Sequence, residues 1–200
     1  MGIDTGSGVS ASRGGRGARE RILQAAQDLF YQRGIANTGV DQIAEHANAS
    51  KRTLYNHYPT KNALVDAYLR SVDTPDGIPR ERPLNDTDSP ARARLLGIFD
   101  ARPDLGTRGC PFHNAAVEAA GTLPEVHHIV VDHKRAFIET LVAACAEVGA
   151  RNPRELGHQL AVLFEGATAL TTSLGETSPF IYAQSAAAAL IDATTGSYGS

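Results

Sequence analysis

The stretch from residue 38 to residue 61 contains two closely spaced sets of helix start and stop signals. Thr38 is a candidate N-cap, and the apolar residues that follow it recur at helical spacing, which predicts a short amphipathic helix. Residues 48–49 then form a turn, Ser50 caps a second short helix, and Pro59 ends that helix. Two short helices joined by so tight a turn predict a helix-turn-helix hairpin with its apolar residues facing inward.

The second of these helices is expected to point a set of polar side chains outward. Leu54 and Tyr58 are its inward-facing residues. Its other positions carry charged or hydrogen-bonding side chains: Lys51, Arg52, Thr53, Tyr55, Asn56 and His57. Arg and Lys can donate to guanine in a major groove, while hydroxyl and imidazole groups can donate to phosphates. These residues are predicted to bind double-stranded DNA; the alternative is a helical hairpin with a solvated basic face.

Two flanking positions extend the predicted DNA-binding surface. Thr60 is predicted to cap the following helix, and Lys61 stands at the start of that helix, where the DNA backbone should pass. The hydroxyl of Thr38 is expected beside backbone amides at a helix N-terminus, which is a favourable seat for a phosphate. Lys61 and Thr38 are therefore predicted to contact phosphates.

The N-terminal part of the chain divides into three segments. Residues 1–17 contain six Gly and three Ser, and we interpret them as a disordered arm. The alternative to a plain disordered terminus is that Arg13 and Arg16 reach into a minor groove. Residues 18–73 are predicted to form the helix-turn-helix DNA-binding domain, and residues 74–89, rich in Pro, Asp, Gly and Arg, a linker.

Residues 90–195 are predicted to form a larger helical domain for ligand binding and dimerisation. Apolar spacing and cap signals predict its helices at the following positions: 90–102, 110–120, 123–148, 152–174 and from 178 onward. No alternating pattern of useful length predicts a strand. With four helices expected in residues 18–73, the fold class is all-α with about nine helices.

Charge and cysteine content limit the classes of protein that fit. Residues 1–75 hold 9 Lys and Arg against 7 Asp and Glu, whereas the remaining residues hold 10 against 15. The basic excess is small, but it lies where DNA binding is predicted. No apolar run approaches the roughly 18 residues of a membrane span. Two cysteines, Cys110 and Cys145, form no disulfide framework, so we expect a cytoplasmic protein with no membrane partner.

The segment from Ala18 to Asp73 resembles the DNA-binding domain of the tetracycline-repressor (TetR) family. The resemblance rests most strongly on Leu54-Tyr55-Asn56-His57-Tyr58 followed by Lys61. Further on, the segment from Arg108 to Phe112, with Asn114-Ala115-Ala116, resembles a recurrent segment in one branch of the family. The resemblance implies a homodimeric transcriptional regulator, usually a repressor, that binds a near-palindromic operator and responds to a small-molecule effector.

The resemblance also implies roles for single residues. Base contacts would come from Lys51, Arg52 and Tyr55, and phosphate contacts from Thr38, Thr53, His57 and Lys61. Arg52 departs from the family pattern, in which a small residue or proline is common at this position. The last two helices of each subunit would pair with their counterparts as a four-helix bundle.

Residues of the C-terminal domain are assigned to a pocket and to a dimer interface. Six of them lie on helices that are expected to surround a central cavity: Asn114, Glu118, His133, Phe137, Phe164 and Thr168. The alternative is that they are ordinary core and helix-pairing residues. The dimer interface is expected at Leu160, Leu163, Phe164, Ala167 and the face formed by residues 186–190.

A second functional hypothesis is a regulator that responds to a metal or to redox state. Five candidate ligands crowd into 21 residues: His113, Glu118, His127, His128 and His133. No pair of them has the His-Glu-x-x-His spacing, so neither a metal site nor a cofactor is predicted. The alternative keeps the His113/His133 region and Cys110 as candidates for a metal or redox sensor. Nucleophile-elbow, phosphate-loop and dinucleotide-binding motifs are absent from the sequence, so an enzyme is not expected.

Overall fold

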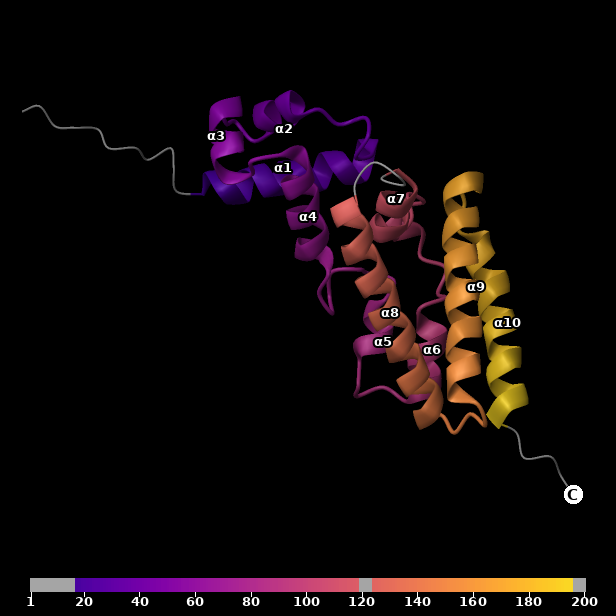
Figure 1. The fold of residues 1–200 in the computed structure, drawn as a ribbon. Coiled ribbons are helices and arrows are strands. Elements are labelled where there is room, and N and C mark those ends of the chain that lie inside the picture. The colour runs from indigo at the N-terminus through magenta and orange to yellow at the C-terminus, as the bar shows by residue number, and fades with distance from the viewer. Residues whose placement is uncertain (1–16, 119–123, 196–200) are drawn as a thin grey trace, which may run out of the picture.

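The computed structural model describes residues 17–118 and 124–195, and these residues fold into an elongated all-helical protein (Figure 1). They form ten α-helices and no strand, which confirms the predicted fold class. The arm predicted at the N-terminus, including Arg13 and Arg16, lies outside the described residues except for Gly17. Among the described helices, none combines the length and the apolar character that a bilayer span requires.

Four helices form the N-terminal head: α1 (Ala18–Arg33), α2 (Val40–His46), α3 (Lys51–His57) and α4 (Lys61–Val72). The three shorter ones pack around α1, and the side chains between them are fully buried. The largest of these buried side chains are Ile22, Ile43, Leu54, Leu64 and Leu69. Short helices are marginal alone, so this shared core stabilises the positions of α2 and α3.

Side-chain caps begin two of the head helices, as predicted. Ser50 Oγ accepts a hydrogen bond of 3.0 Å from the amide of Thr53 at the start of α3. Thr60 Oγ1 accepts one of 3.0 Å from the amide of Ala63 at the start of α4. Each cap satisfies an amide that has no partner within its helix.

The prediction that Thr38 caps α2 is wrong. Gly39 occupies the cap position, and its amide donates to the side chain of Gln42 at 2.9 Å. The Thr38 side chain turns inward, is 1 % exposed, and its hydroxyl donates to the carbonyl of Gly34 at 2.7 Å. Thr38 therefore ties the end of α1 to the start of α2.

The segment predicted as a linker, residues 74–89, is packed against the rest of the protein. It contains one turn of helix, α5 (Arg82–Asn85), and it buries Ile78 and Leu84 at 5 % and 2 % exposure. Pro, Gly and Asp are abundant there because the backbone turns repeatedly, and the two buried apolar residues anchor it to the core. The segment is a folded connector between the head and the body.

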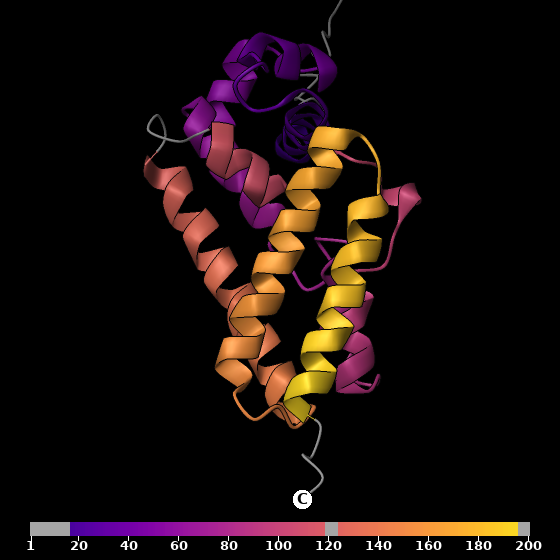
Figure 2. The same ribbon diagram turned by 90° about the vertical axis from the view of Figure 1, so that its right-hand side faces the viewer.

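Five helices form the C-terminal body: α6 (Ala91–Gly97), α7 (Pro111–Glu118), α8 (Pro124–Glu147), α9 (Pro153–Leu174) and α10 (Ser178–Thr195). Figure 2 shows α9 and α10 side by side, with α8 and α6 on either side of them. The helix predicted to reach residue 102 ends at Gly97 instead. Tighter turns follow it, in which amides bond carbonyls three residues earlier, and a short 3-10 helix begins at Pro103.

Aromatic rings fill the centre of the body. Phe164 of α9 contacts Phe137, Phe99 and Phe180, with ring centroids 5.1, 6.1 and 6.0 Å apart. Both α8 and α10 pack along α9, so α9 is the central helix of the body. Phe164 therefore lies at the centre of the body's core.

Candidate DNA-binding surface and ligand cavity

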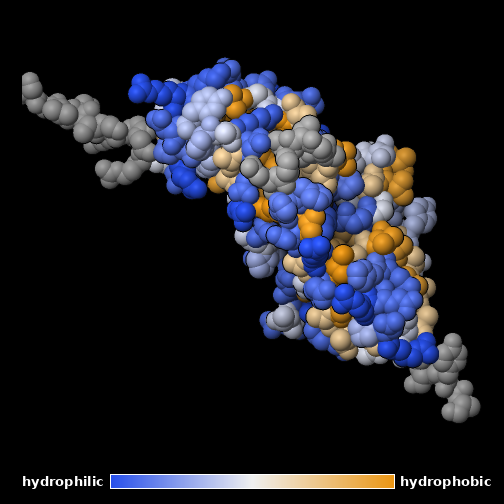
Figure 3. Space-filling view, in the orientation of Figure 1, coloured by the Kyte–Doolittle hydropathy of each residue, from blue (hydrophilic) through white to orange (hydrophobic). Residues whose placement is uncertain are grey.

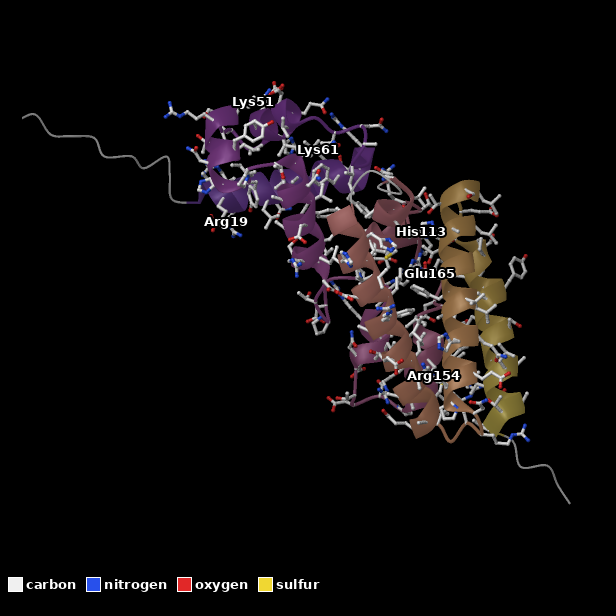
Figure 4. All side chains as sticks on the ribbon, in the orientation of Figure 1. Arg19, Lys51, Lys61, His113, Arg154 and Glu165 are labelled. Atoms are coloured by element: carbon white, nitrogen blue, oxygen red, sulfur yellow. The ribbon has the colours of Figure 1, made fainter. Side chains whose placement is uncertain are left out.

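The outer face of α3 carries the polar side chains that the sequence predicts there. Lys51, Arg52, Tyr55 and Asn56 are exposed, and Tyr55 is 40 % exposed in spite of its size. Lys51 lies at the side of the head that faces away from the body (Figure 4). In the space-filling view, hydrophilic residues cover much of the head (Figure 3). A convex, polar surface carried by one short helix is suited to a major groove.

Lys51 is held by a neighbouring carboxylate. Its ammonium lies 2.8 Å from Asp41 Oδ1 on α2, and the hydrogen bond to Asp41 raises the pKa of Lys51. Both side chains are exposed to solvent, so the pair is weak. Lys51 can therefore exchange Asp41 for a guanine or a phosphate at little cost.

Thr53 and His57 of the same helix are half-buried. The Thr53 hydroxyl is 2.8 Å from Ser50 Oγ, so it takes part in the cap of its own helix. The exposed residues of α3 are therefore available for base contacts, and the phosphate contacts of Thr53 and His57 remain predictions.

Lys61 makes an internal contact in addition to any contact with DNA. Its ammonium donates to the carbonyl of Ile35 at 2.6 Å, and burial lowers the pKa of Lys61. An ammonium has three donors, so two remain for a phosphate. Thr38 has no free donor for a phosphate, because its buried hydroxyl already donates to the carbonyl of Gly34. The structure gives no support to Thr38 as a phosphate contact.

A cavity of about 490 Å³ lies between the head and the body. Its walls come from α1 and α4 on one side, from α9 and α10 on the other, and from two loops between them. Aromatic rings supply much of the lining: Tyr31, Tyr68, Phe164 and Phe180. The volume falls within the range that holds small organic ligands in other proteins.

Two hydroxyls in the cavity wall have no hydrogen-bond partner among the described residues. Thr168 and Thr171 are each 2 % exposed, and their Oγ1 atoms are buried without a partner. Buried hydroxyls are usually satisfied, so an unpaired pair in the wall of a cavity marks a place for a polar group.

Arg80 adds a cation to the same cavity. Its guanidinium lies over the ring of Phe180, 3.8 Å from the ring centroid. Two of its nitrogens donate to the carbonyls of Asp100 and Arg102 at 3.1 and 3.4 Å. The cavity thus offers aromatic surface, two hydroxyls and one fixed positive charge.

Comparison with known proteins agrees with the fold and with the head. Residues 22–68 match the family described as bacterial regulatory proteins, tetR family. The HTH-type transcriptional regulator LuxR of Vibrio harveyi is 28 % identical over 158 residues, which are 74 % of each chain. The HTH-type transcriptional regulator TtgR of Pseudomonas putida is 36 % identical over 86 residues, 41 % of each chain.

A solved structure extends the similarity to the body. The crystal structure of a TetR-family transcriptional regulator from Streptomyces coelicolor matches 90 % of this chain and 96 % of its own, with a TM-score of 0.78 and 27 % identity. The chain belongs to the TetR family. It is therefore a DNA-binding transcriptional regulator and not an enzyme.

The pocket residues predicted for this TetR-family protein are divided among different sites. Phe164 and Thr168 line the cavity of about 490 Å³. His133 and Phe137 line a smaller cavity of about 210 Å³ near the connector.

The two remaining pocket predictions, Asn114 and Glu118, line none of the cavities described here. Asn114 donates to the carbonyl of Arg108 at 3.0 Å, and Glu118 accepts from the amide of Ala36 in the head at 3.0 Å. Both side chains serve contacts between neighbouring segments, and their assignment to the pocket stays a prediction.

The dimer interface predicted on α9 needs correction. Leu160, Phe164 and Ala167 are at most 4 % exposed within one subunit, so they cannot also face a partner. A second apolar stripe lies on the opposite face of α9 and continues on α10. Its large residues are more than half exposed: Val162, Leu170, Leu174, Ile181 and Tyr182.

The histidine-rich segment of this TetR-family protein does not converge on one site. His113 Nδ1 lies 3.6 Å from Glu165 Oε2, whereas His127 and His128 are exposed on α8. His133 is buried, and its Nδ1 lies 2.8 Å from Asp73 Oδ1. Burial lowers the pKa of His133, but interactions with the neighbouring Cys110, Glu81 and Asp73 outweigh burial and raise it to about 10.

Sequence reasoning missed several residues of these sites. Tyr31, Arg80 and Thr171 line the large cavity, and Glu81 faces His133. They come from segments that lie far apart in the chain, and no local pattern links them. For Glu81 a weak signal existed: it is an acidic residue close to the apolar Ile78 and Leu84, which are buried.

Proposed function

We propose that this TetR-family protein is a homodimeric repressor that binds a near-palindromic operator through α3 and is released by a small molecule. The observation that carries the proposal is the cavity of about 490 Å³, whose wall includes residues of α1 and α4 as well as α9 and α10. A ligand in that cavity would touch the DNA-binding head and the body at once.

The position of the cavity supports a coupling between ligand and operator. A ligand changes operator affinity only if it binds the DNA-bound and free conformations with different affinities. Tyr31 and Tyr68 belong to head helices, so a shift of the head relative to α9 changes the shape of the cavity directly. In the proposed mechanism, the ligand favours the shape in which the two recognition helices no longer match the operator.

The lining of the cavity indicates the chemistry of the effector. Four aromatic rings favour a flat or apolar body, and the free hydroxyls of Thr168 and Thr171 favour a polar substituent. The guanidinium of Arg80 favours a substituent that is an acceptor or an anion. We propose an aromatic effector with at least one hydrogen-bonding oxygen.

The exposed stripe on α9 and α10 supports the proposed dimer. It consists of the five large apolar residues named above, and several alanines follow Tyr182 on α10. Such a patch on two antiparallel helices can pair with its own copy as a four-helix bundle. In Figure 3, hydrophobic residues are visible on the side of the body where α9 and α10 lie.

Selection of binding sites from a random duplex library at fixed salt tests the operator proposal, and light scattering tests the dimer. A dimeric protein that enriches one near-palindrome with half-sites about 34–36 Å apart is the expected result. A monomer in solution, or the absence of any enriched sequence, would overturn the proposal of a dimeric operator-binding repressor in the cytoplasm.

Once an operator has been enriched, a screen of small molecules can identify the effector. Aromatic carboxylic acids and phenols are screened for a rise in the melting temperature, and each hit is then tested for release of the operator. The Thr168→Val/Thr171→Val variant, which keeps shape but lacks both hydroxyls, serves as the control. A hit that releases wild type and this variant equally would contradict the assignment of the effector to this cavity.

A further inference from the structure

Four side chains from four separate segments meet where the head joins the body. Asp73 ends α4, Glu81 belongs to the connector, Cys110 precedes α7, and His133 lies on α8. One oxygen of Glu81, the sulfur of Cys110 and a ring nitrogen of His133 lie within 4.8 Å of one another. All three residues are buried.

Two atoms of this cluster have no hydrogen-bond partner among the described residues. They are His133 Nε2 and Glu81 Oε1, in residues that are 6 % and 8 % exposed. The two atoms face each other at 3.4 Å. Buried polar atoms are seldom left without partners, and a shared cation would satisfy both.

The distances fit a small tetrahedral ion. Zinc binds nitrogen, oxygen and sulfur ligands at roughly 2.0–2.3 Å, which separates its ligand atoms by roughly 3.3–3.8 Å. The 3.4 Å between His133 Nε2 and Glu81 Oε1 lies in that range. Cys110 Sγ lies within 4.8 Å of a ligand atom of each of these residues and supplies a third ligand.

The imidazole of His133 is already oriented as a metal ligand. Asp73 Oδ1 lies 2.8 Å from Nδ1, which leaves Nε2 directed at Glu81. The ring of Phe112 stacks on the imidazole at 3.6 Å with an interplanar angle of 6°. A carboxylate on the second ring nitrogen is the usual support of a zinc-bound histidine.

Charge and access also favour a cation. Asp73 and Glu81 each pair with His133, and Glu165 pairs with the neighbouring Lys134. The ammonium of Lys134 lies 2.5 Å from Glu165 Oε1 and 3.8 Å from Cys110 Sγ, so Glu165 offsets much of its charge. The cavity of about 210 Å³ is lined by Asp73, Glu81 and His133, which gives an ion a route from solvent.

We propose that Glu81, Cys110 and His133 bind a divalent metal ion of the zinc class, with a fourth position open to water or another ligand. Thiolate, imidazole and carboxylate together match zinc better than the hard cations, which prefer oxygen alone. The site is separate from the effector cavity proposed above, although Cys110 also lines that cavity. Unlike the predicted histidine group, it uses only His133 of the five candidates.

Cobalt(II) is the probe, because its spectrum reports on sulfur ligands. Full-length protein is treated with a chelator, kept reduced with a phosphine, and titrated with Co²⁺ at neutral pH. We expect one equivalent to bind, with a thiolate-to-cobalt charge-transfer band in the near ultraviolet and visible bands of tetrahedral Co²⁺. Added Zn²⁺ should abolish these bands by displacement.

Matched variants locate the site. Cys110→Ser should lose the charge-transfer band, whereas Cys145→Ser, which changes the other buried cysteine, should retain it. Asp73→Asn should keep the band but weaken Co²⁺ binding by roughly 10- to 100-fold, because it alters only the support of His133. Circular dichroism verifies that each variant is folded; if Cys110→Ser is not, Glu81→Gln takes its place and should weaken binding at least as much as Asp73→Asn.

Two results would overturn the proposal. One is a folded wild-type protein that shows no thiolate-to-cobalt band at one equivalent, which would leave His133 as an imidazolium shared by Asp73 and Glu81. The other is a band that persists in Cys110→Ser or disappears in Cys145→Ser. Neither result depends on DNA, so it is distinct from a failure of the proposed repressor function.

Discussion

The head and the body place their functional residues on opposite sides of their helices. In the head, the side chains proposed to bind DNA point outward from α3. In the body, the side chains proposed to bind an effector or a metal ion point inward, among them Thr168, Thr171 and His133. A surface can be built by one helix, whereas an interior site needs several segments. The difference explains why the head was the easier part to interpret from sequence.

The largest expected effect comes from the surface of the head. Lys51→Ala/Arg52→Ala should weaken operator binding by roughly 4 kcal/mol, about a thousandfold, because each base contact contributes roughly 1–3 kcal/mol. Both residues are exposed, so the melting temperature should stay the same. Titration of labelled operator at fixed salt measures the affinity.

Arg135→Ala/Arg154→Ala is the matched control, since it removes two exposed charges from the body instead. Figure 4 shows Arg154 at the end of the body far from the head. If both pairs weaken binding equally, net charge rather than base contact determines the affinity. That result would mean that the head contributes no more to DNA affinity than the body does.

The second effect concerns the one part of the body proposed to work through its surface. Leu170→Asp should weaken the dimer by roughly 3 kcal/mol, because a two-fold axis places the unpaired charge in the interface twice. Light scattering should then detect monomers at micromolar concentration, and operator affinity should fall with dimerisation. Val117→Asp, on an exposed residue of α7, is the control that should leave a dimer. A Leu170→Asp dimer of unchanged affinity would place the interface elsewhere.

Local signals explain what the sequence predicted correctly. Ser50 and Thr60 were recognisable as caps because a cap bonds an amide three residues ahead. Leu54 and Tyr58 were recognisable as inward-facing because their spacing is that of one helical turn. The fold class, the helices of the head and the exposed residues of α3 all follow from such short-range rules.

Long-range contacts explain what was missed or wrong. Helix α9 has two apolar stripes, and the sequence cannot tell which one faces the core; the structure buries Leu160 and exposes Val162. Asp73 and His133 are 60 residues apart in the chain, so their contact at 2.8 Å is not visible in a local pattern. Thr38 was misassigned because Gly39, the adjacent residue, serves equally well as a cap.

The third prediction treats Thr38 as an internal residue of the head. Thr38→Val should destabilise the protein by about 1–2 kcal/mol, because the carbonyl of Gly34 loses a buried hydrogen bond. Urea unfolding measures the change, and Thr60→Ala, which removes a cap, should cost about 1 kcal/mol for comparison. Operator affinity of the folded variant should match wild type. Unchanged stability with weaker operator binding would instead make Thr38 a phosphate contact.

The smallest expected effect, with the opposite sign, comes from the interior of the body. Thr168→Val and Thr171→Val should each raise the free energy of unfolding of the ligand-free protein by about 1 kcal/mol, because each removes a buried hydroxyl that lacks a protein partner. The same changes should abolish the response to an effector bound in the cavity. Natural cores seldom retain such a cost, so a gain in stability with a loss of response would mark both hydroxyls as functional. A loss of stability would show that ordered water already satisfies them, and the cavity would then be a hydrated part of the core.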